Sequence, residues 1–150
     1  MAKELLCDSY PIRFQITESA SDGVVTFTGE FARCGVPTQN GRVYSERLWL
    51  REFARLSRAM KENRVFAHLD HPGSGRTELK EASHIITSLE VKNGVVIGSA
   101  RALSTRAGQD LKALVHDNCT LGVSSRGFGS VVEDNQGNKI VQDDFKLITF

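Results

Sequence analysis

The stretch HIITSLEVKNGVVIGSARAL, residues 84–103, decides the fold class of this chain. It holds two apolar runs, residues 84–91 and 95–103, on either side of Lys92-Asn93-Gly94. Asn-Gly is the strongest short signal for a β-hairpin, because these residues tolerate the positive backbone φ that a tight turn requires. The stretch therefore predicts two antiparallel strands joined by a short turn.

On the N-terminal side of this hairpin, the sequence predicts a second hairpin, a helix and a short strand. Residues 12–17 alternate between apolar and polar side chains, and residues 24–31 do so again after a turn at 21–23. Period two is typical of half-buried strands. Ser45 is a suitable N-cap for a helix whose apolar positions recur at helical spacing: Leu48, Trp49, Phe53, Leu56 and Met60. Residues 65–69 then predict a short strand.

On the C-terminal side, Ser104 is the expected N-cap of a second helix, residues 105–117. Further strands are expected at 120–124, 128–133, 139–141 and 144–150. Strands dominate the order and two helices interrupt them. This pattern favours an α+β fold, with an antiparallel sheet or barrel and the helices packed on its outside.

The composition and net charge of the chain disfavour some classes of function. The 150 residues are 40% hydrophobic and 25% charged, with a formal net charge of +1. These values indicate one globular domain, residues 1–150, with its own core, and they disfavour nucleic-acid and membrane partners. Three cysteines at no motif spacing fit a reducing compartment, and residues 1–10 do not have the pattern of a secretory signal.

Two segments hold the residues that could carry chemistry: HLDHP, residues 68–72, and LGVSSRGFGS, residues 121–130. Small residues surround paired serines in the second segment, and a serine nucleophile needs a partnered histidine as base. A zinc site is the other chemical interpretation, with His68 and His71 joined by Cys119 or Asp70. Residues i and i+3 of a strand point to opposite faces, so we expect no metal and no cofactor here.

At these segments the chain resembles the prohead core serine proteases of T-even-type tailed bacteriophages. The matching blocks occur in the family's order and cover about residues 40–150. They are NGRVY (40–44), DHP (70–72), SHII (83–86), GVSSRGFGS (122–130) and DFKL (144–147).

The resemblance implies a role for each matched residue. The family's nucleophile falls on Ser124 and its general base on His71. The backbone around Arg126 and Gly127, the Arg126 side chain, and Ser125 become candidates for binding the oxyanion or the substrate. The family resembles the herpesvirus protease assemblin in fold, whose third catalytic member is a histidine on a later strand. No histidine follows Ser124 here, so Asp144 is the candidate third member, with Asp143 as its alternate and Asp70 as a weaker one.

The resemblance also implies the function. We expect a serine endopeptidase that cleaves scaffold and core proteins, the major capsid protein and itself during prohead maturation. It would act inside the assembling prohead, in the cytoplasm of the bacterial host. Cleavage after glutamate would call for a basic recognition group, for which Arg126 and Arg76 are candidates.

Three alternatives stay open at the level of sequence. The chain could be an inactive structural relative in phage head or tube assembly. It could be a homodimer, as assemblin is, or a monomer. Family members usually continue beyond the strand that ends at Phe150, so the chain could be trimmed, processed or naturally short of a C-terminal extension.

Overall fold

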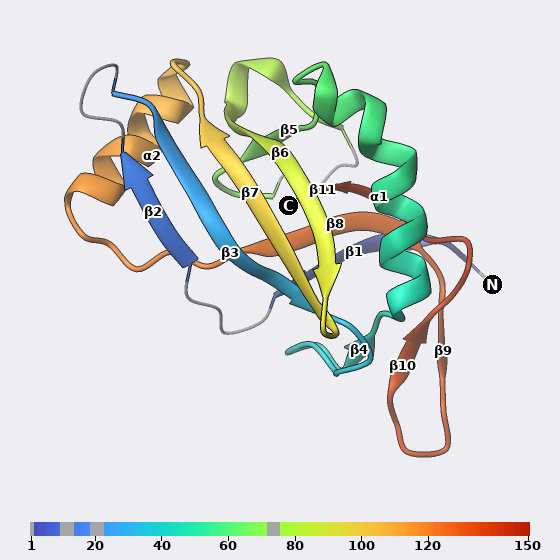
Figure 1. The fold of residues 1–150 in the computed structure, drawn as a ribbon. Coiled ribbons are helices and arrows are strands. Elements are labelled where there is room, and N and C mark those ends of the chain that lie inside the picture. The colour runs from blue at the N-terminus through green and yellow to red at the C-terminus, as the bar shows by residue number, and fades with distance from the viewer. Residues whose placement is uncertain (1, 10–13, 19–22, 72–75) are drawn as a thin grey trace.

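The computed structural model describes residues 2–9, 14–18 (backbone only), 23–71 and 76–150. Within these ranges the chain forms an α+β fold (Figure 1). The elements are β1 (Glu4–Ser9), β2 (Phe14–Glu18), β3 (Val25–Arg33), β4 (Arg42–Val43), α1 (Glu46–Lys61), β5 (Phe66–His68), the 3₁₀ turn η1 (Leu79–Glu81), β6 (Ala82–Lys92), β7 (Val95–Ala102), α2 (Arg106–His116), β8 (Ser124–Gly129), β9 (Val131–Glu133), β10 (Lys139–Val141) and β11 (Lys146–Thr149).

The largest sheet has the order β2-β3-β7-β6-β5 and is antiparallel throughout. Its centre is the predicted β6–β7 hairpin, with Asn93 at φ 53° and Gly94 at φ 74° in the turn. The predicted pairing of β2 with β3 is also confirmed. In β7 every second residue is buried, which is the period-two pattern of a strand with one face on the core.

The second sheet, β1-β8-β11, is also antiparallel and carries the segment with the paired serines. A third, small sheet joins β4, β10 and β9, and its β9–β10 hairpin projects from the body (Figure 1). The three sheets do not close into one barrel, so of the two expected arrangements the sheet is the one observed.

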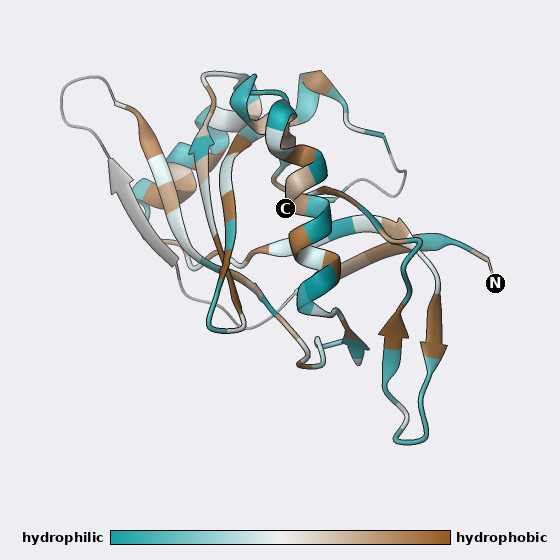
Figure 2. Cartoon of the chain, turned by 45° about the vertical axis from the view of Figure 1, so that its right-hand side comes forward, coloured by the Kyte–Doolittle hydropathy of each residue, from teal (hydrophilic) through white to brown (hydrophobic). Residues whose placement is uncertain are grey.

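Helix α1 begins where predicted, and the Ser45 side chain accepts a hydrogen bond from the Leu48 amide. Figure 2 shows apolar and polar residues alternating around it, as expected of a helix with one buried face. Trp49 is at the centre of the core and stacks on Tyr44 and Phe53, with ring centroids 4.9 and 5.7 Å away. Of the helices in the described ranges, none is both long and apolar enough to span a membrane.

The structure differs in four local features from what the sequence led us to expect. Helix α2 is capped by Thr105, whose side chain accepts from the Gly108 amide, and not by Ser104. Strand β1 was not expected, because a buried carboxylate interrupts its short apolar run. Strand β4 was not expected either. The strand expected at 120–124 instead begins at Ser124, and the Ser-Ser-Arg-Gly segment forms β8 itself.

Candidate active site

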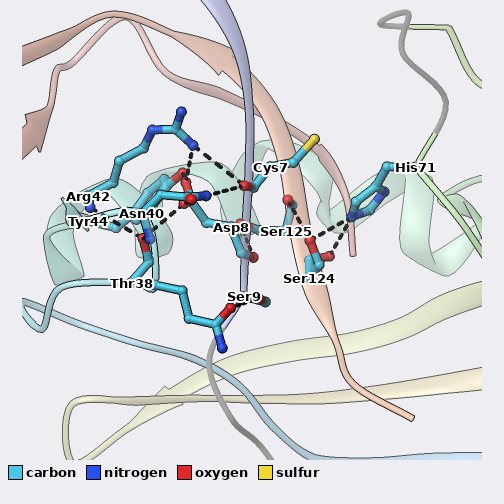
Figure 3. A network of polar contacts seen from close by, with 11 residues as sticks. Cys7, Asp8, Ser9, Thr38, Asn40, Arg42, Tyr44, His71, Ser124 and Ser125 are labelled. Carbon is cyan, nitrogen blue, oxygen red and sulfur yellow. Dashed lines mark hydrogen bonds and ion pairs between the residues drawn. The ribbon is translucent and has the colours of Figure 1, made fainter.

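Ser124 and His71 come from different parts of the chain and meet in the structure (Figure 3). Ser124 is the first residue of β8, and His71 follows the end of β5. The His71 Nε2 atom is 2.9 Å from the Ser124 Oγ atom and 3.1 Å from the Ser124 carbonyl oxygen. Both side chains are half-buried. The structure therefore places Ser124 and His71 within hydrogen-bond distance of each other.

The environment of His71 favours the neutral imidazole. Burial lowers the pKa of His71 below its ordinary value of 6.5, and the positive charges of Arg126 and His68 act in the same direction. A neutral imidazole protonated on Nδ1 accepts a hydrogen bond from the Ser124 hydroxyl through Nε2. The other tautomer would donate from Nε2 to the Ser124 carbonyl oxygen. The first tautomer is the one that can take a proton from the serine.

Beside Ser124, the second sheet has an open edge. Strand β11 pairs with β8 only as far as Thr149, which lies opposite Arg126. Ser124 and Ser125 extend beyond that point and pair only with β1 among the described strands. A substrate backbone can therefore approach the nucleophile from the side that β11 leaves uncovered.

A cavity of about 290 Å³ adjoins Ser124 and His71. Its wall is mostly apolar and includes Phe27, Leu121 and Phe150. His84 also lines it, and burial lowers the pKa of His84 to about 4, so this imidazole is neutral near pH 7. The cavity thus offers a mostly apolar, concave surface next to the serine, of the kind that receives a substrate side chain.

The remaining candidates from the Ser124 loop are inside the fold. Arg126 is fully buried, and its Nη2 atom donates to the backbone oxygen of Arg76 over 2.7 Å. Gly127 is buried against Phe145 and Lys146, and a Cβ atom there would lie 2.6 Å from the Lys146 oxygen. Both residues are paired with strands on both sides, so their backbone amides are within the ladder. Arg76 itself is exposed.

Asp144 and Asp143 pair with residues other than His71, whereas Asp70 lines the cavity beside it. The Asp144 carboxylate accepts hydrogen bonds from the Ser130 amide and hydroxyl, at 2.9 and 2.7 Å. Asp143 is exposed and pairs with Arg47 at 2.6 Å. Among the described residues, His71 Nδ1 is buried and has no hydrogen-bond partner. The prediction that Asp144 assists His71 finds no support in this placement, because its carboxylate binds the Ser130 amide and hydroxyl instead.

Of the residues considered for zinc, His68, Asp70 and His71 line the cavity and Cys119 does not. His68 lies on the cavity wall with its Nε2 atom 3.1 Å from the Glu78 carbonyl oxygen, and Cys119 is an exposed free thiol. Throughout the described ranges, no three histidine, cysteine or acidic side chains are grouped as metal ligands.

Sequence reasoning missed a buried polar cluster beside Ser124 and Ser125 (Figure 3). Its centre is the carboxylate of Asp8, in the unpredicted strand β1. A signal for it was present: Asn40, Arg42 and Tyr44 are two residues apart, so in an extended segment they share one side and could converge on one anion.

Comparisons with known proteins agree on one family. The model of the prohead core protein serine protease family matches residues 15–149. The prohead core protein protease of Enterobacteria phage T4 is 30% identical over 129 residues, covering 79% of this chain and 58% of that protein. The solved structure of the bacteriophage T4 capsid assembly protease superposes with a TM-score of 0.87 at 24% identity, covering 98% of this chain and 94% of that one.

The chain thus spans 58% of the length of the curated relative that it matches, while sharing the fold of the solved protease over almost all of its length. The resemblance and the α+β architecture expected from the sequence are both confirmed. This chain belongs to the prohead core protein serine protease family.

Proposed function

We propose that this protein is a serine endopeptidase in which Ser124 is the nucleophile and His71 the general base. The observation that carries the proposal is the 2.9 Å contact between His71 Nε2 and Ser124 Oγ. The lowered pKa of His71 supports it, because a base must be neutral before it can accept a proton.

The mechanism is acyl transfer. Ser124 Oγ attacks the peptide carbonyl carbon while its proton passes to His71 Nε2, which gives a tetrahedral oxyanion. The C–N bond then breaks, and His71 returns the proton to the leaving amine. A water molecule, activated by the same imidazole, attacks the acyl-enzyme and releases the second product with the serine restored.

The oxyanion requires hydrogen-bond donors that are already in position. Of the candidates Ser125, Arg126 and Gly127, we place this role in the backbone at Ser125. Support comes from strand pairing, since among the described strands β8 has a neighbour on one side only at Ser125 but on both sides at Arg126 and Gly127. The buried Arg126 side chain then shapes the site through its bond to the Arg76 carbonyl group.

We infer the substrates from the names of two relatives. One relative is named a prohead core protein protease and another a capsid assembly protease. We propose that this chain cleaves the scaffold or core proteins and the major capsid protein of an assembling prohead, and itself, within the host cytoplasm. The cavity beside Ser124 would hold one substrate side chain. If cleavage follows glutamate, Arg76 is the better placed basic group, since Arg126 is buried.

The test compares neighbouring serines. Wild type, Ser124→Ala and Ser125→Ala would be incubated with peptides from the scaffold and capsid proteins, and the products measured by intact mass. We expect cleavage by wild type, measurable cleavage by Ser125→Ala, and a loss of at least about a thousandfold in Ser124→Ala, the scale of a removed serine nucleophile. Cleavage by Ser124→Ala would overturn the assignment. Silence of all three proteins would favour the inactive structural relative.

A further inference from the structure

The block Asn40–Tyr44 belongs to the family resemblance, yet the proposed chemistry makes no use of it. In the structure this block and Thr38 surround the carboxylate of Asp8 (Figure 3). Thr38 Oγ1 donates over 2.9 Å, Asn40 Nδ2 over 3.0 Å and Arg42 Nη1 over 3.0 Å, and the Tyr44 hydroxyl donates as well. Asp8 is 3% exposed. A carboxylate buried this deeply is stable only with such partners.

The same loop also holds the backbone of β1 on both sides of Asp8. Asn40 Nδ2 donates to the Cys7 carbonyl oxygen over 3.0 Å. The Gln39 amide donates to the Ser9 carbonyl oxygen over 3.4 Å. Three consecutive residues of β1 are therefore fixed to one loop, with the Asp8 carboxylate as the central attachment.

This part of β1 is the support of the nucleophile. Asp8 lies opposite Ser125 and Ser9 opposite Ser124 in the β1–β8 ladder. The Ser125 hydroxyl donates to the Asp8 carbonyl oxygen over 3.3 Å. Because β11 pairs no further than Arg126, β1 is the neighbour that sets the position of β8 at Ser124 among the described strands. A displacement of β1 would move Ser124 relative to His71, which is attached to a different sheet.

We propose that Asp8 is a positioning residue for Ser124: its buried carboxylate gathers the Thr38–Tyr44 loop and thereby holds β1 against the nucleophile end of β8. The inference rests on the proposed function of Ser124. Its physical basis is that attack requires the reacting groups in near-contact geometry, where a misplacement of about 1 Å costs on the order of a hundredfold in rate.

The test distinguishes a misplaced Ser124 from a loss of folded protein. Asp8→Asn removes the charge but keeps the size. Glu52→Gln makes the same change at a buried carboxylate on α1, which accepts a hydrogen bond from the Leu147 amide of β11. The probe is a serine-directed phosphonate, with the labelled fraction followed over time by intact mass. We expect Asp8→Asn to label about 10- to 100-fold more slowly to the same final extent, and Glu52→Gln to stay within about twofold of wild type. With a cleaved peptide, kcat should fall in Asp8→Asn while KM changes little.

A purely structural role would lower the final extent of labelling and leave the rate constant of the folded molecules unchanged, and that result would overturn the proposal. If Asp8→Asn does not fold, Tyr44→Phe decides, because it removes one donor to Asp8 and retains the ring that stacks on Trp49. It should label several-fold more slowly, and a wild-type rate would contradict us. Absence of labelling at Ser124 in wild type would instead refute the proposed function, and the positioning role with it.

Discussion

Two buried carboxylates hold the β1-β8-β11 sheet from opposite edges, and they do so differently. Asp8 lies within β1, and its arginine partner Arg42 has a side chain that is 17% exposed. Glu52 lies on α1 and reaches β11, and its partners Arg51 and Arg55 are 40% and 43% exposed. The arginine of the Asp8 cluster is thus mostly covered, whereas the Glu52 cluster is covered only on its carboxylate side.

The two clusters also act on different parts of β8. Glu52 accepts from the Leu147 amide over 2.9 Å, and Leu147 lies opposite Gly127. Arg55 donates to the Leu147 carbonyl oxygen over 2.6 Å, so helix α1 covers the backbone groups of an edge strand. Asp8 instead lies opposite Ser125, next to the nucleophile. One cluster therefore closes an edge of the sheet, and the other supports the candidate active site.

The largest expected effect is on stability. Asp8→Ala leaves the buried Tyr44 hydroxyl and the mostly covered Arg42 guanidinium without their anion, and we expect it to lower the free energy of unfolding by about 3–5 kcal/mol. Glu52→Ala should cost less, about 1–2 kcal/mol, because its arginines can turn to water and the main loss is the bond to the Leu147 amide. Urea unfolding of both variants measures the difference. Equal losses would show that the exposure of the arginines does not distinguish the two clusters.

Gly127 tests how tightly β8 is packed between the two edges. A Cβ atom there would lie 2.6 Å from the Lys146 carbonyl oxygen and from the Phe145 ring, so Gly127→Ala should destabilise by about 1–3 kcal/mol. Gly122→Ala is the matched control, since nothing lies within 4 Å of a Cβ atom at that position, and its effect should stay within about 0.5 kcal/mol. Similar thermal midpoints for the two variants would mean that β8 can shift at little cost.

The smallest expected effect is the pH dependence of the stability that the Glu52 cluster contributes. Burial by itself would raise the pKa of Glu52, but hydrogen bonds from Arg55, the Leu147 amide and Arg51 outweigh it and hold the pKa below the ordinary 4.5. A lowered folded-state pKa means that the ionised carboxylate stabilises the fold above pH 4.5 and loses this effect as pH falls through the folded value. The stability gap between wild type and Glu52→Gln should therefore shrink from pH 7 to pH 3. A gap of constant size would exclude ionisation as its origin.

The sequence predicted the elements whose local patterns agree with their final environment. Helix α1 has both its cap at Ser45 and its apolar stripe, and the β6–β7 hairpin has Asn93-Gly94 at its turn. In each case the physics is local: a side chain caps the first turn, or a turn accepts positive φ. Such features can be read without knowing what lies nearby in space.

Strands β1 and β8 could not be predicted in this way. The SSRGFG sequence of β8 is rich in serine and glycine and has low intrinsic strand preference, yet pairing with strands on both sides makes it the middle of a sheet. In β1, Asp8 occupies an inward-facing position that the pattern reserves for apolar residues. Its partners are about 30 residues away in the chain, as the separation of 30 between Asp8 and Thr38 shows.

The sequence suggested the pair Ser124 and His71, but it did not reveal the buried residues that lie around them. Ser124 and His71 followed from the family resemblance, and the structure places them in contact. Asp144 was chosen because of its position after Ser124 in the chain, but its carboxylate satisfies the Ser130 amide and hydroxyl instead. A third member of such a site depends on side-chain direction, which position along the sequence does not reveal.

The most direct test of the Ser124–His71 pair is phosphonate labelling with the modified residue mapped by peptide mass, in wild type and in His71→Gln. We predict a single adduct on Ser124 in wild type and labelling at least about a hundredfold slower in His71→Gln, because general-base assistance contributes on that order. Equal labelling of the two proteins, or an adduct on another serine, would contradict the assignment.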